Sequence, residues 1–229
     1  QLKFKEAMVH LKSAVKLQPT YSEAHNNLGN ALSGLNRFRE ANIYYKEAIR
    51  LNPNYPEAHN NLANSLSKKL RLDEAIIHYK KAIQLKPEYS EAHFNFGVTL
   101  NKWNRSEQAI GYLEEAIRLN PNFTKARLSL GNILMQKYEF KTAIHHFKTI
   151  IKVNPNHAIA HNSLGSALAE QGNFEQAIVH FQTSITINPR YLEAHQNLGT
   201  IFLILGQPEQ SAVYFKIAKE IAMNETLKQ

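Results

Sequence analysis

The apolar residues of this chain recur at spacings of three and four, in stretches separated by short polar segments. Such spacing is typical of amphipathic helices, each about 13 residues long here. The first helix of segment 22–55 is predicted to bury one stripe: His25, Leu28, Gly29 and Leu32. The second is predicted to bury another: Ala41, Tyr45, Ala48 and Ile49. The pattern therefore predicts an all-α chain built from pairs of helices.

The pairs repeat with a period of 34 residues, and this period is marked by prolines at 19, 53, 87, 121, 155 and 189. Proline lacks the amide donor and disfavours helix at the preceding residue, so each should end a second helix. The chain divides into half a unit, six full units and a tail: 1–21, 22–55, 56–89, 90–123, 124–157, 158–191, 192–225 and 226–229. One pair cannot bury its apolar face alone, so the units should stack into a solenoid of about thirteen helices.

Small residues at two fixed registers indicate where the paired helices touch. One register holds Gly29, Ala63, Gly97, Gly131, Gly165 and Gly199, and another holds Ala41, Ala75, Ala109, Ala143, Ala177 and Ser211. Glycine inside a helix costs about 1 kcal/mol relative to alanine, so its recurrence implies close approach at this point. Ser22, Ser90 and Thr124 are predicted as N-caps.

The period and the order Leu-Gly, Ala, Tyr or Phe, Ala, Pro resemble the tetratricopeptide repeat over essentially the whole chain. The resemblance implies a right-handed α-α superhelical solenoid that binds proteins. Two registers depart from the family pattern. Its fourth position carries His25, His59, His93, Arg127, His161 and His195, and its eleventh carries Leu32, Leu66, Leu100, Leu134, Leu168 and Phe202. The string A-H-x-N-L-G is most similar to the repeats of O-GlcNAc transferases and of similar bacterial arrays.

Asparagines dominate the stripe opposite the apolar one, which holds positions 2, 5, 6, 9, 12 and 13 of each unit. They are Asn26, Asn27, Asn30, Asn60, Asn61, Asn64, Asn95, Asn132, Asn162 and Asn197. In tetratricopeptide proteins the first helices line the concave surface, so the resemblance implies a groove lined with amides. A carboxamide offers donors and an acceptor, which suit the backbone of an extended peptide. In O-GlcNAc transferases such a ladder holds substrate peptide. The alternative is that asparagine is a polar filler, although it is a poor helix former.

The middle of this stripe is less polar and more basic. Phe94, Val98, Leu128 and Met135 replace amides, and Lys102 and Lys125 stand beside them. These residues are predicted to form an apolar and basic specificity spot, with scattered surface hydrophobes as the equally weighted alternative. A carboxylate clamp would need a lysine and an asparagine four residues apart on a first helix. At the corresponding positions, Asn26 and Asn30, both residues are asparagines, so the lysine is missing.

No pattern in the sequence indicates catalysis, a cofactor or a metal. Residues 34 apart in a solenoid lie on successive pairs, too far apart for one ion, so the periodic histidines are interpreted as packing residues. There is no nucleophile with a base and no phosphate-binding loop. The chain has no cysteine, which excludes disulfides and thiolate sites. We therefore expect that this chain is not an enzyme and uses no cofactor.

Composition narrows the partners. The net charge is +8, but residues 124–157 alone carry six basic and one acidic residue, with no arginine-rich run, so nucleic acid is not expected. No apolar run reaches the roughly 18 to 20 residues of a membrane span. Cytoplasm is weakly favoured and the compartment is otherwise open. Asn104, Asn122 and Asn224 lie in N-x-S/T sequons, which would carry glycans only in a secretory setting.

The two ends of the chain raise further expectations. It begins with Gln1 rather than Met, which favours a piece of a longer protein. Leu203 and Ile204 occupy a stripe that is polar in earlier repeats, so in the intact protein a further helix or domain is predicted to cover this end. In this fragment, either the last helix is expected to run past Met223 or a second copy is expected to pack there. The leading hypothesis is a peptide-binding module. The recognition arm of a larger enzyme and a purely structural array remain open.

Overall fold

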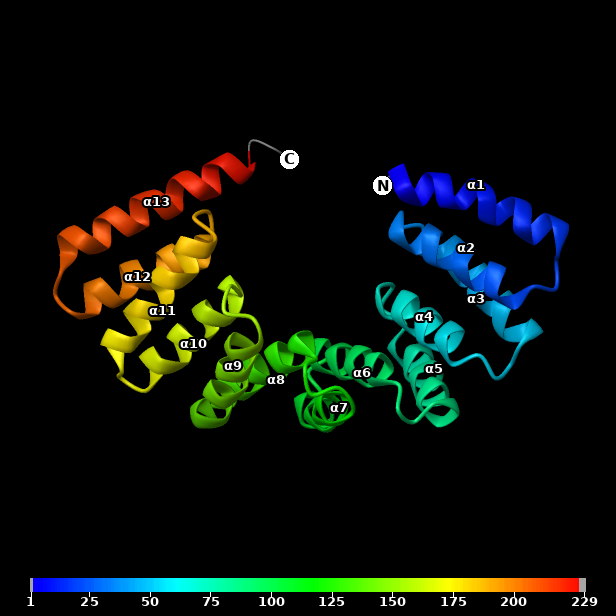
Figure 1. Ribbon diagram of the computed structural model, residues 1–229, viewed down its shortest axis with the longest axis horizontal. Helices are drawn as coiled ribbons and strands as arrows, with labels where there is room; N and C mark the ends of the chain where they lie inside the picture. The colour runs from blue at the N-terminus through cyan, green and yellow to red at the C-terminus, as the bar shows by residue number, and fades with distance from the viewer. Residues whose placement is uncertain (1, 227–229) are drawn as a thin grey trace. The chain divides into compact units, whose positions relative to one another are not determined.

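The computed structural model describes residues 2–226, with side chains described for residues 5–224. Within that part of the chain there are thirteen α-helices and no β-strand (Figure 1), which confirms the predicted all-α fold and the helix count. The helices are α1 (Leu2–Leu17), α2 (Ser22–Gly34), α3 (Phe38–Leu51), α4 (Pro56–Ser67), α5 (Leu72–Leu85), α6 (Ser90–Lys102), α7 (Ser106–Leu119), α8 (Thr124–Gln136), α9 (Phe140–Val153), α10 (Ala158–Glu170), α11 (Phe174–Ile187), α12 (Leu192–Ile204) and α13 (Pro208–Thr226). Most of the predicted tail 226–229 lies outside the described residues.

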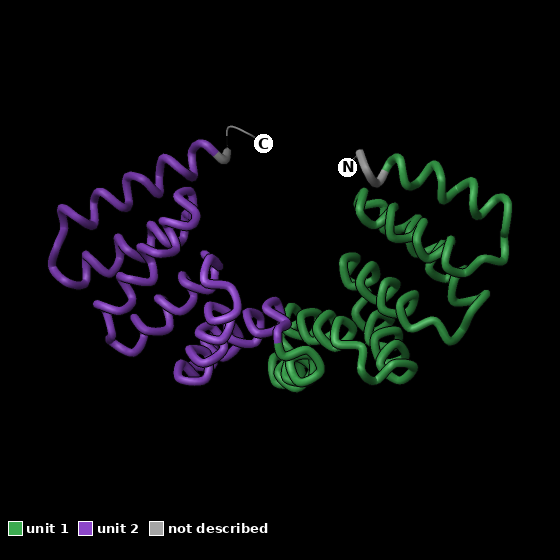
Figure 2. The backbone as a smooth tube through the Cα atoms, viewed as in Figure 1, with its two compact units in different colours: residues 1–121 green, residues 122–229 purple. Residues whose placement is uncertain are grey.

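The chain forms two compact units, residues 1–121 and 122–229 (Figure 2). Inside each unit, every helix from α2 to α7 and from α9 to α13 packs against the helix before it. Even-numbered helices also contact the next even-numbered helix: α2 with α4, α4 with α6, α8 with α10 and α10 with α12. Each unit is therefore a two-layer solenoid, with the even-numbered helices in one layer and the odd-numbered helices in the other.

The periodic prolines lie in the turns that follow α1, α3, α5, α7, α9 and α11. Helix α3, for example, ends at Leu51, two residues before Pro53. The two prolines outside the series, Pro56 and Pro208, are instead the first residues of α4 and α13. Proline is tolerated there because the first amides of a helix have no partner inside it. The predicted register of helices and turns is confirmed.

The N-cap prediction was wrong. Ser22, Ser90 and Thr124 are the first residues of α2, α6 and α8, and the N-caps are Tyr21, Tyr89 and Phe123, without a capping side-chain hydrogen bond. The two serine hydroxyls instead donate to the neighbouring Glu23 and Glu91 carboxylates. Among the caps described for α2 to α12, a side chain caps only α10, where His157 Nδ1 accepts from the Ala160 amide at 3.1 Å. Residue propensity alone therefore puts these caps one residue too late.

The turn between the two helices of every 34-residue repeat contains one residue with a left-handed backbone. The φ angles are 60° at Asn36, 59° at Leu70, 58° at Asn104, 62° at Tyr138, 77° at Gly172 and 71° at Gly206. Glycine and asparagine adopt this region readily, whereas bulky side chains pay a steric penalty there. Leu70 and Tyr138 are also exposed, and the Tyr138 ring contacts only the edge of Phe140 among the described rings.

At four of the five glycines of this register an aromatic ring faces the glycine, and at Gly97 the facing side chain is Leu113. At Gly165 the Cβ of any other residue would lie 2.7 Å from Cε1 of Phe181, a side chain that is fully buried. Since non-bonded carbons prefer about 3.5 to 4.0 Å, the ring occupies the space that a side chain would need. At Gly165 the paired helices can therefore approach closely, because glycine leaves room for the Phe181 ring.

The last two helices expose apolar residues. Leu203 is 58% and Ile204 is 59% exposed, and Val213 and Phe215 on α13 are exposed as well. As expected, α13 runs past Met223, to Thr226. Within the described residues no helix combines the length and the apolar character that a membrane crossing requires.

Candidate ligand-binding face

The asparagine stripe lies on the layer of even-numbered helices, and the structure divides it into two sets. Asn26, Asn60 and Asn162, at position 5 of their 34-residue repeats, are buried, with 3%, 3% and 8% of their surface exposed. The others are exposed or half-buried: Asn27, Asn30, Asn61, Asn64 and Asn95 in the first unit and Asn132 and Asn197 in the second. We call this second set the amide face.

Hydrogen bonds between successive repeats join the two sets. Asn61 Nδ2 donates to Asn26 Oδ1 at 3.0 Å, and Asn95 Nδ2 donates to Asn60 Oδ1 at 3.1 Å. In the second unit, Asn197 Nδ2 donates to Asn162 Oδ1 at 2.9 Å. The same bond thus forms three times between residues 35 apart, and the buried asparagines link neighbouring helices of one layer.

Burial corrects part of the sequence prediction. Asn26, Asn60 and Asn162 were expected to face a ligand, but they are buried and accept hydrogen bonds from the next even-numbered helix of their layer. Their role in the structure is to orient the next residue. An amide whose position is fixed by a buried partner is better placed for binding than a free surface side chain.

Each carboxamide that makes this bond retains hydrogen-bonding capacity. An asparagine has two N–H donors and a carbonyl oxygen with two lone pairs. For Asn95, donating one N–H to the buried asparagine leaves one donor and the acceptor available to a ligand. Asn197 Nδ2 donates to Ser166 Oγ as well, so Asn197 keeps only its carbonyl oxygen for a ligand. Such a donor and acceptor side by side match the C=O and N–H groups of an extended peptide.

Position 9 shows a second arrangement in the first unit. Tyr45 Oη donates to Asn30 Oδ1 at 2.9 Å, and Tyr79 Oη donates to Asn64 Oδ1 at 2.6 Å. Burial raises the pKa of both tyrosines to about 12, so their hydroxyls remain protonated and donate. The Nδ2 groups of Asn30 and Asn64 donate no hydrogen bond within the described residues.

The residues of the predicted apolar and basic spot belong to both units. On α6 of the first unit, Phe94 and Val98 are half-buried and Lys102 is exposed. On α8 of the second, Leu128 and Met135 are half-buried and Lys125 is exposed. Within each unit, apolar and basic side chains therefore share one helix. That they act together as one spot stays a prediction.

The periodic histidines have a packing role that explains their register. His25, His59, His93, His161 and His195 are buried, and the Nε2 of each donates to the carbonyl of the proline six residues earlier, at 2.8 to 3.1 Å. This bond connects the first helix of one repeat to the turn that ends the previous repeat. Within the described residues, no group of three or more potential ligands could hold a metal ion.

Two of these histidines pair with a second histidine. His59 Nδ1 lies 3.0 Å from His78 Nδ1, and His161 Nδ1 lies 3.1 Å from His180 Nδ1. Because Nε2 of the first ring donates to proline, its Nδ1 accepts and the second ring donates. Burial, followed by the nearby His59, lowers the pKa of His78 to about 4. His78 is therefore neutral at physiological pH.

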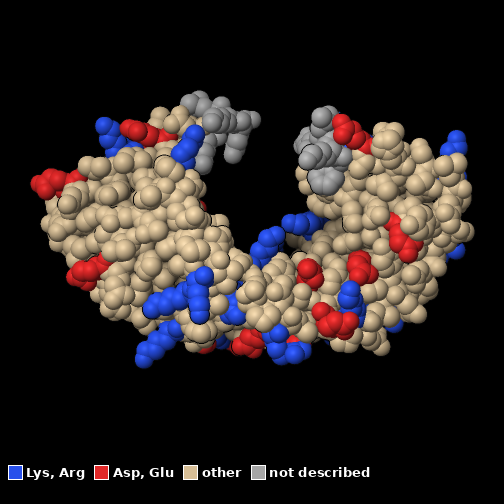
Figure 3. Space-filling model, viewed as in Figure 1, with Lys and Arg blue, Asp and Glu red and all other residues tan. Residues whose placement is uncertain are grey.

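Charges on the surface give no single direction to a ligand. Figure 3 shows basic and acidic side chains scattered over the visible face of both units, most of which is uncharged. The charge at position 13 of the 34-residue repeats varies, however: the residue is basic at Lys68 and Lys102 and acidic at Glu170. The charge at this register therefore differs between repeats of the first unit and a repeat of the second.

Comparison with known proteins identifies the family. Models of the tetratricopeptide repeat match residues 22–55, 56–89, 78–111 and 158–191, more than half of the chain. The chain belongs to the tetratricopeptide-repeat family. Proteins of this family are in general modules for protein interaction, and they are typically not catalytic. No curated protein matches the chain as a relative.

Solved structures agree with this assignment. YrrB, described as a TPR protein with an unusual peptide-binding site, is 26% identical, covers 80% of this chain and 95% of its own, and has a TM-score of 0.64. MamA of Desulfovibrio magneticus RS-1 is 20% identical over 74% of this chain and 96% of its own, with a TM-score of 0.68. PilF of Pseudomonas aeruginosa is 17% identical over 91% and 97%, with a TM-score of 0.76. The last two show the fold alone.

Sequence reasoning missed residues that shape this face from the odd-numbered layer. Tyr45 and Tyr79 bond to the amide face, but Phe181 takes their register in the second unit and Ser166 takes the register of their asparagine partners. The signal was present as a paired departure from Tyr and Asn to Phe and Ser. Without the hydrogen bond between the two registers, nothing connected the two changes.

Proposed function

We propose that this tetratricopeptide-repeat protein binds an extended segment of a partner protein along the amide face. The observation that carries the proposal is the repeated bond from Asn61, Asn95 and Asn197 to a buried asparagine. It fixes the carboxamides at one register and leaves groups on Asn95 and Asn197 free to bond peptide backbone. The peptide-binding site described for YrrB supports the same use of the fold.

Specificity along the face would come from the side chains beside the amides. Phe94 and Val98 would contact apolar side chains of the bound segment, and Lys102 would attract an acidic one. Leu128, Met135 and Lys125 would do the same on α8. The hypothesis of a recognition arm in a larger enzyme predicts the same binding by this chain and rests on the register of the asparagines.

The test is selection of peptides from a displayed library of random sequences on the full chain. Enriched peptides should lose affinity by about tenfold when Asn61 and Asn95 are both replaced by alanine, because two hydrogen bonds of about 1 kcal/mol each are lost and water replaces part of each. Fluorescence anisotropy measures the affinity. Phe94→Ser should weaken binding with little loss of melting temperature, as should Leu128→Ser.

The matched control is Asn54→Ala with Asn156→Ala, two exposed asparagines in the turns between units. These variants should bind as the unchanged chain does. If no peptide is enriched, or if both pairs of variants lose affinity equally, the amide face is not the binding surface. A large loss of stability in Phe94→Ser with unchanged affinity would show that Phe94 packs within the fold only.

We also propose that the exposed apolar surface of α12 and α13 binds a second copy of this chain. Leu203 and Ile204 on α12 and Phe215 on α13 are exposed there, and burying them would contribute about 25 cal/mol per Å2 of apolar area. Light scattering should show an increase in mass with concentration, and Leu203→Gln with Ile204→Gln should abolish it. A monomer at every concentration would refute this self-association.

A further inference from the structure

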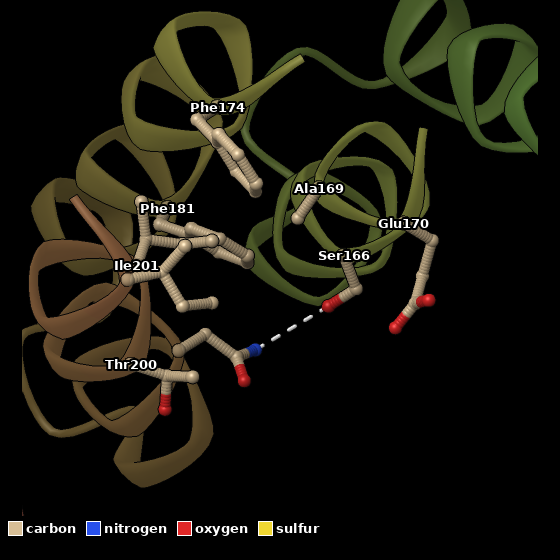
Figure 4. Close-up of a pocket in the computed structure, with 9 residues that line it drawn as sticks. Ser166, Ala169, Glu170, Phe174, Phe181, Thr200 and Ile201 are labelled. Carbon is tan, nitrogen blue, oxygen red and sulfur yellow. Dashed lines mark hydrogen bonds between the residues drawn. The ribbon is translucent and has the colours of Figure 1, made fainter. Parts of the chain in front are cut away.

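A cavity of about 300 Å³ opens on the even-numbered layer of the second unit, between α10, α11 and α12 (Figure 4). Phe174 and Phe181 come from α11 and Ile201 from α12, and Ser166 and Glu170 lie across from them on α10. Most of its wall is thus aromatic and aliphatic, with polar groups along α10.

Two side chains that line the cavity are smaller than their counterparts in repeats 22–55 and 56–89. There, the Tyr45 hydroxyl with the Asn30 carboxamide, and the Tyr79 hydroxyl with the Asn64 carboxamide, fill the equivalent space. Phe181 lacks the hydroxyl, and Ser166 is shorter than asparagine by a carboxamide. Repeats 90–123 and 192–225 also lack both groups, with Leu113 and Val98 in one and Phe215 and Thr200 in the other, and the cavity lies beside Ser166 and Phe181.

The polar side of the cavity is connected to the amide face. Asn197 Nδ2, which donates to the buried Asn162, also lies 3.3 Å from Ser166 Oγ (dashed in Figure 4). The carbonyl oxygen of Asn197 is not used in either bond. A peptide backbone bound to that oxygen would therefore run past the mouth of the cavity, with one of its side chains directed inward.

The charge at the cavity selects the kind of side chain. Glu170 is exposed and, within the described part of the chain, forms no salt bridge. The same register carries lysine at Lys68 and Lys102, so an acidic group here is specific to this repeat. An apolar wall that ends at one carboxylate fits a long aliphatic stem with a cationic end.

We propose that this cavity binds the side chain of a lysine or arginine in the peptide whose backbone the amide face holds. The aliphatic stem lies against Phe174, Phe181 and Ile201, and the cationic group bonds to the Glu170 carboxylate. This inference rests on the proposed function and adds a sequence requirement to it. Long-range attraction cannot imitate it, since a net charge of +8 favours acidic peptides.

Peptides selected on the full chain provide the test. They should share a basic residue at one aligned position, and replacing that residue by norleucine, which keeps the stem and removes the charge, should weaken binding about twofold to fivefold. Glu170→Gln should abolish the difference between the basic and the norleucine peptide. Such a loss of coupling would assign the cationic group to Glu170.

A second variant tests the cavity by filling it. Ser166→Asn with Phe181→Tyr rebuilds the pair already present as Asn30 and Tyr45, so the melting temperature should change little. Affinity for the basic peptide should fall to that of the same peptide with alanine at the aligned position. The control is Asn30→Ser with Tyr45→Phe, which makes the reverse change in the first unit and should leave the affinity intact.

The outcomes separate the two proposals. If no peptide is enriched, the proposed function fails and the cavity has no peptide to read. If peptides are enriched and depend on Asn61 and Asn95 but lack a shared basic residue, the function stands and the cavity proposal is wrong. The same holds if their basic residue is unaffected by Glu170→Gln and by filling the cavity.

Discussion

Replacing Asn60 by alanine should lower the free energy of unfolding by about 2 kcal/mol. Asn60 is 3% exposed, and its Oδ1 accepts a hydrogen bond from Asn95 Nδ2 at 3.1 Å. Alanine removes this link between α4 and α6 and leaves a gap where the carboxamide was packed. A buried side chain that joins successive repeats should therefore contribute to stability rather than to binding.

Urea unfolding followed by circular dichroism measures this effect, with the midpoint as the readout because repeat arrays do not always unfold in two states. The matched control is Asn27→Ala, in the same layer but exposed. It should change stability by about 0.5 kcal/mol or less, as surface substitutions usually do. Equal losses for Asn60→Ala and Asn27→Ala would contradict the division of the asparagines into a structural and a ligand-facing set.

Acid should destabilise the protein between about pH 6.5 and 4, and His78→Tyr should remove part of this effect. The pKa of His78 falls from 6.5 to about 4, because the ring is buried, with further contributions from His59 and Lys46 and an opposing one from Glu74. Between these two values the unfolded ring carries a proton that the folded ring does not. Stability from this group is therefore complete above pH 6.5 and is lost as the pH falls toward 4.

The expected contribution of His78 is about 1 to 2 kcal/mol, after allowance for its partial contact with solvent. Tyrosine fits the site, since Tyr44, Tyr112 and Tyr214 occupy the same register in other repeats. In those repeats, Nδ1 of the buried histidine (His25, His93 or His195) has no hydrogen-bond partner, and the repeat is folded. His78→Tyr leaves His59 in the same situation, so the variant should remain folded at neutral pH. Burial also lowers the pKa of His146 to about 4, and that residue remains.

Urea midpoints at about pH 7.5 and pH 5 measure the difference. The control is His10→Tyr, the same substitution at an exposed histidine on α1. The loss of stability on acidification should be smaller for His78→Tyr than for the unchanged chain, and the same for His10→Tyr. Equal losses for all three proteins would show that the histidine pair does not couple folding to pH.

The sequence by itself determined the class of fold, the number of helices and the register of the turns. These features depend on local rules: apolar spacing sets a helix, proline ends it, and a period of 34 residues repeats the pair. The sequence also identified the asparagine stripe, because positions on a helix determine which residues share a side. It could not divide that stripe, since Asn26 and Asn27 are adjacent and chemically identical.

Only the tertiary structure decided which asparagines are buried, because burial at position 5 comes from the neighbouring even-numbered helix and not from the helix itself. The same holds for the histidines, whose donor bond reaches a proline carbonyl in the preceding turn. The cavity at Ser166 and Phe181 required both layers to be seen together. Contacts between residues that are 15 to 35 positions apart, as in Tyr45 with Asn30 and Asn61 with Asn26, leave no local periodicity by which the sequence could reveal them.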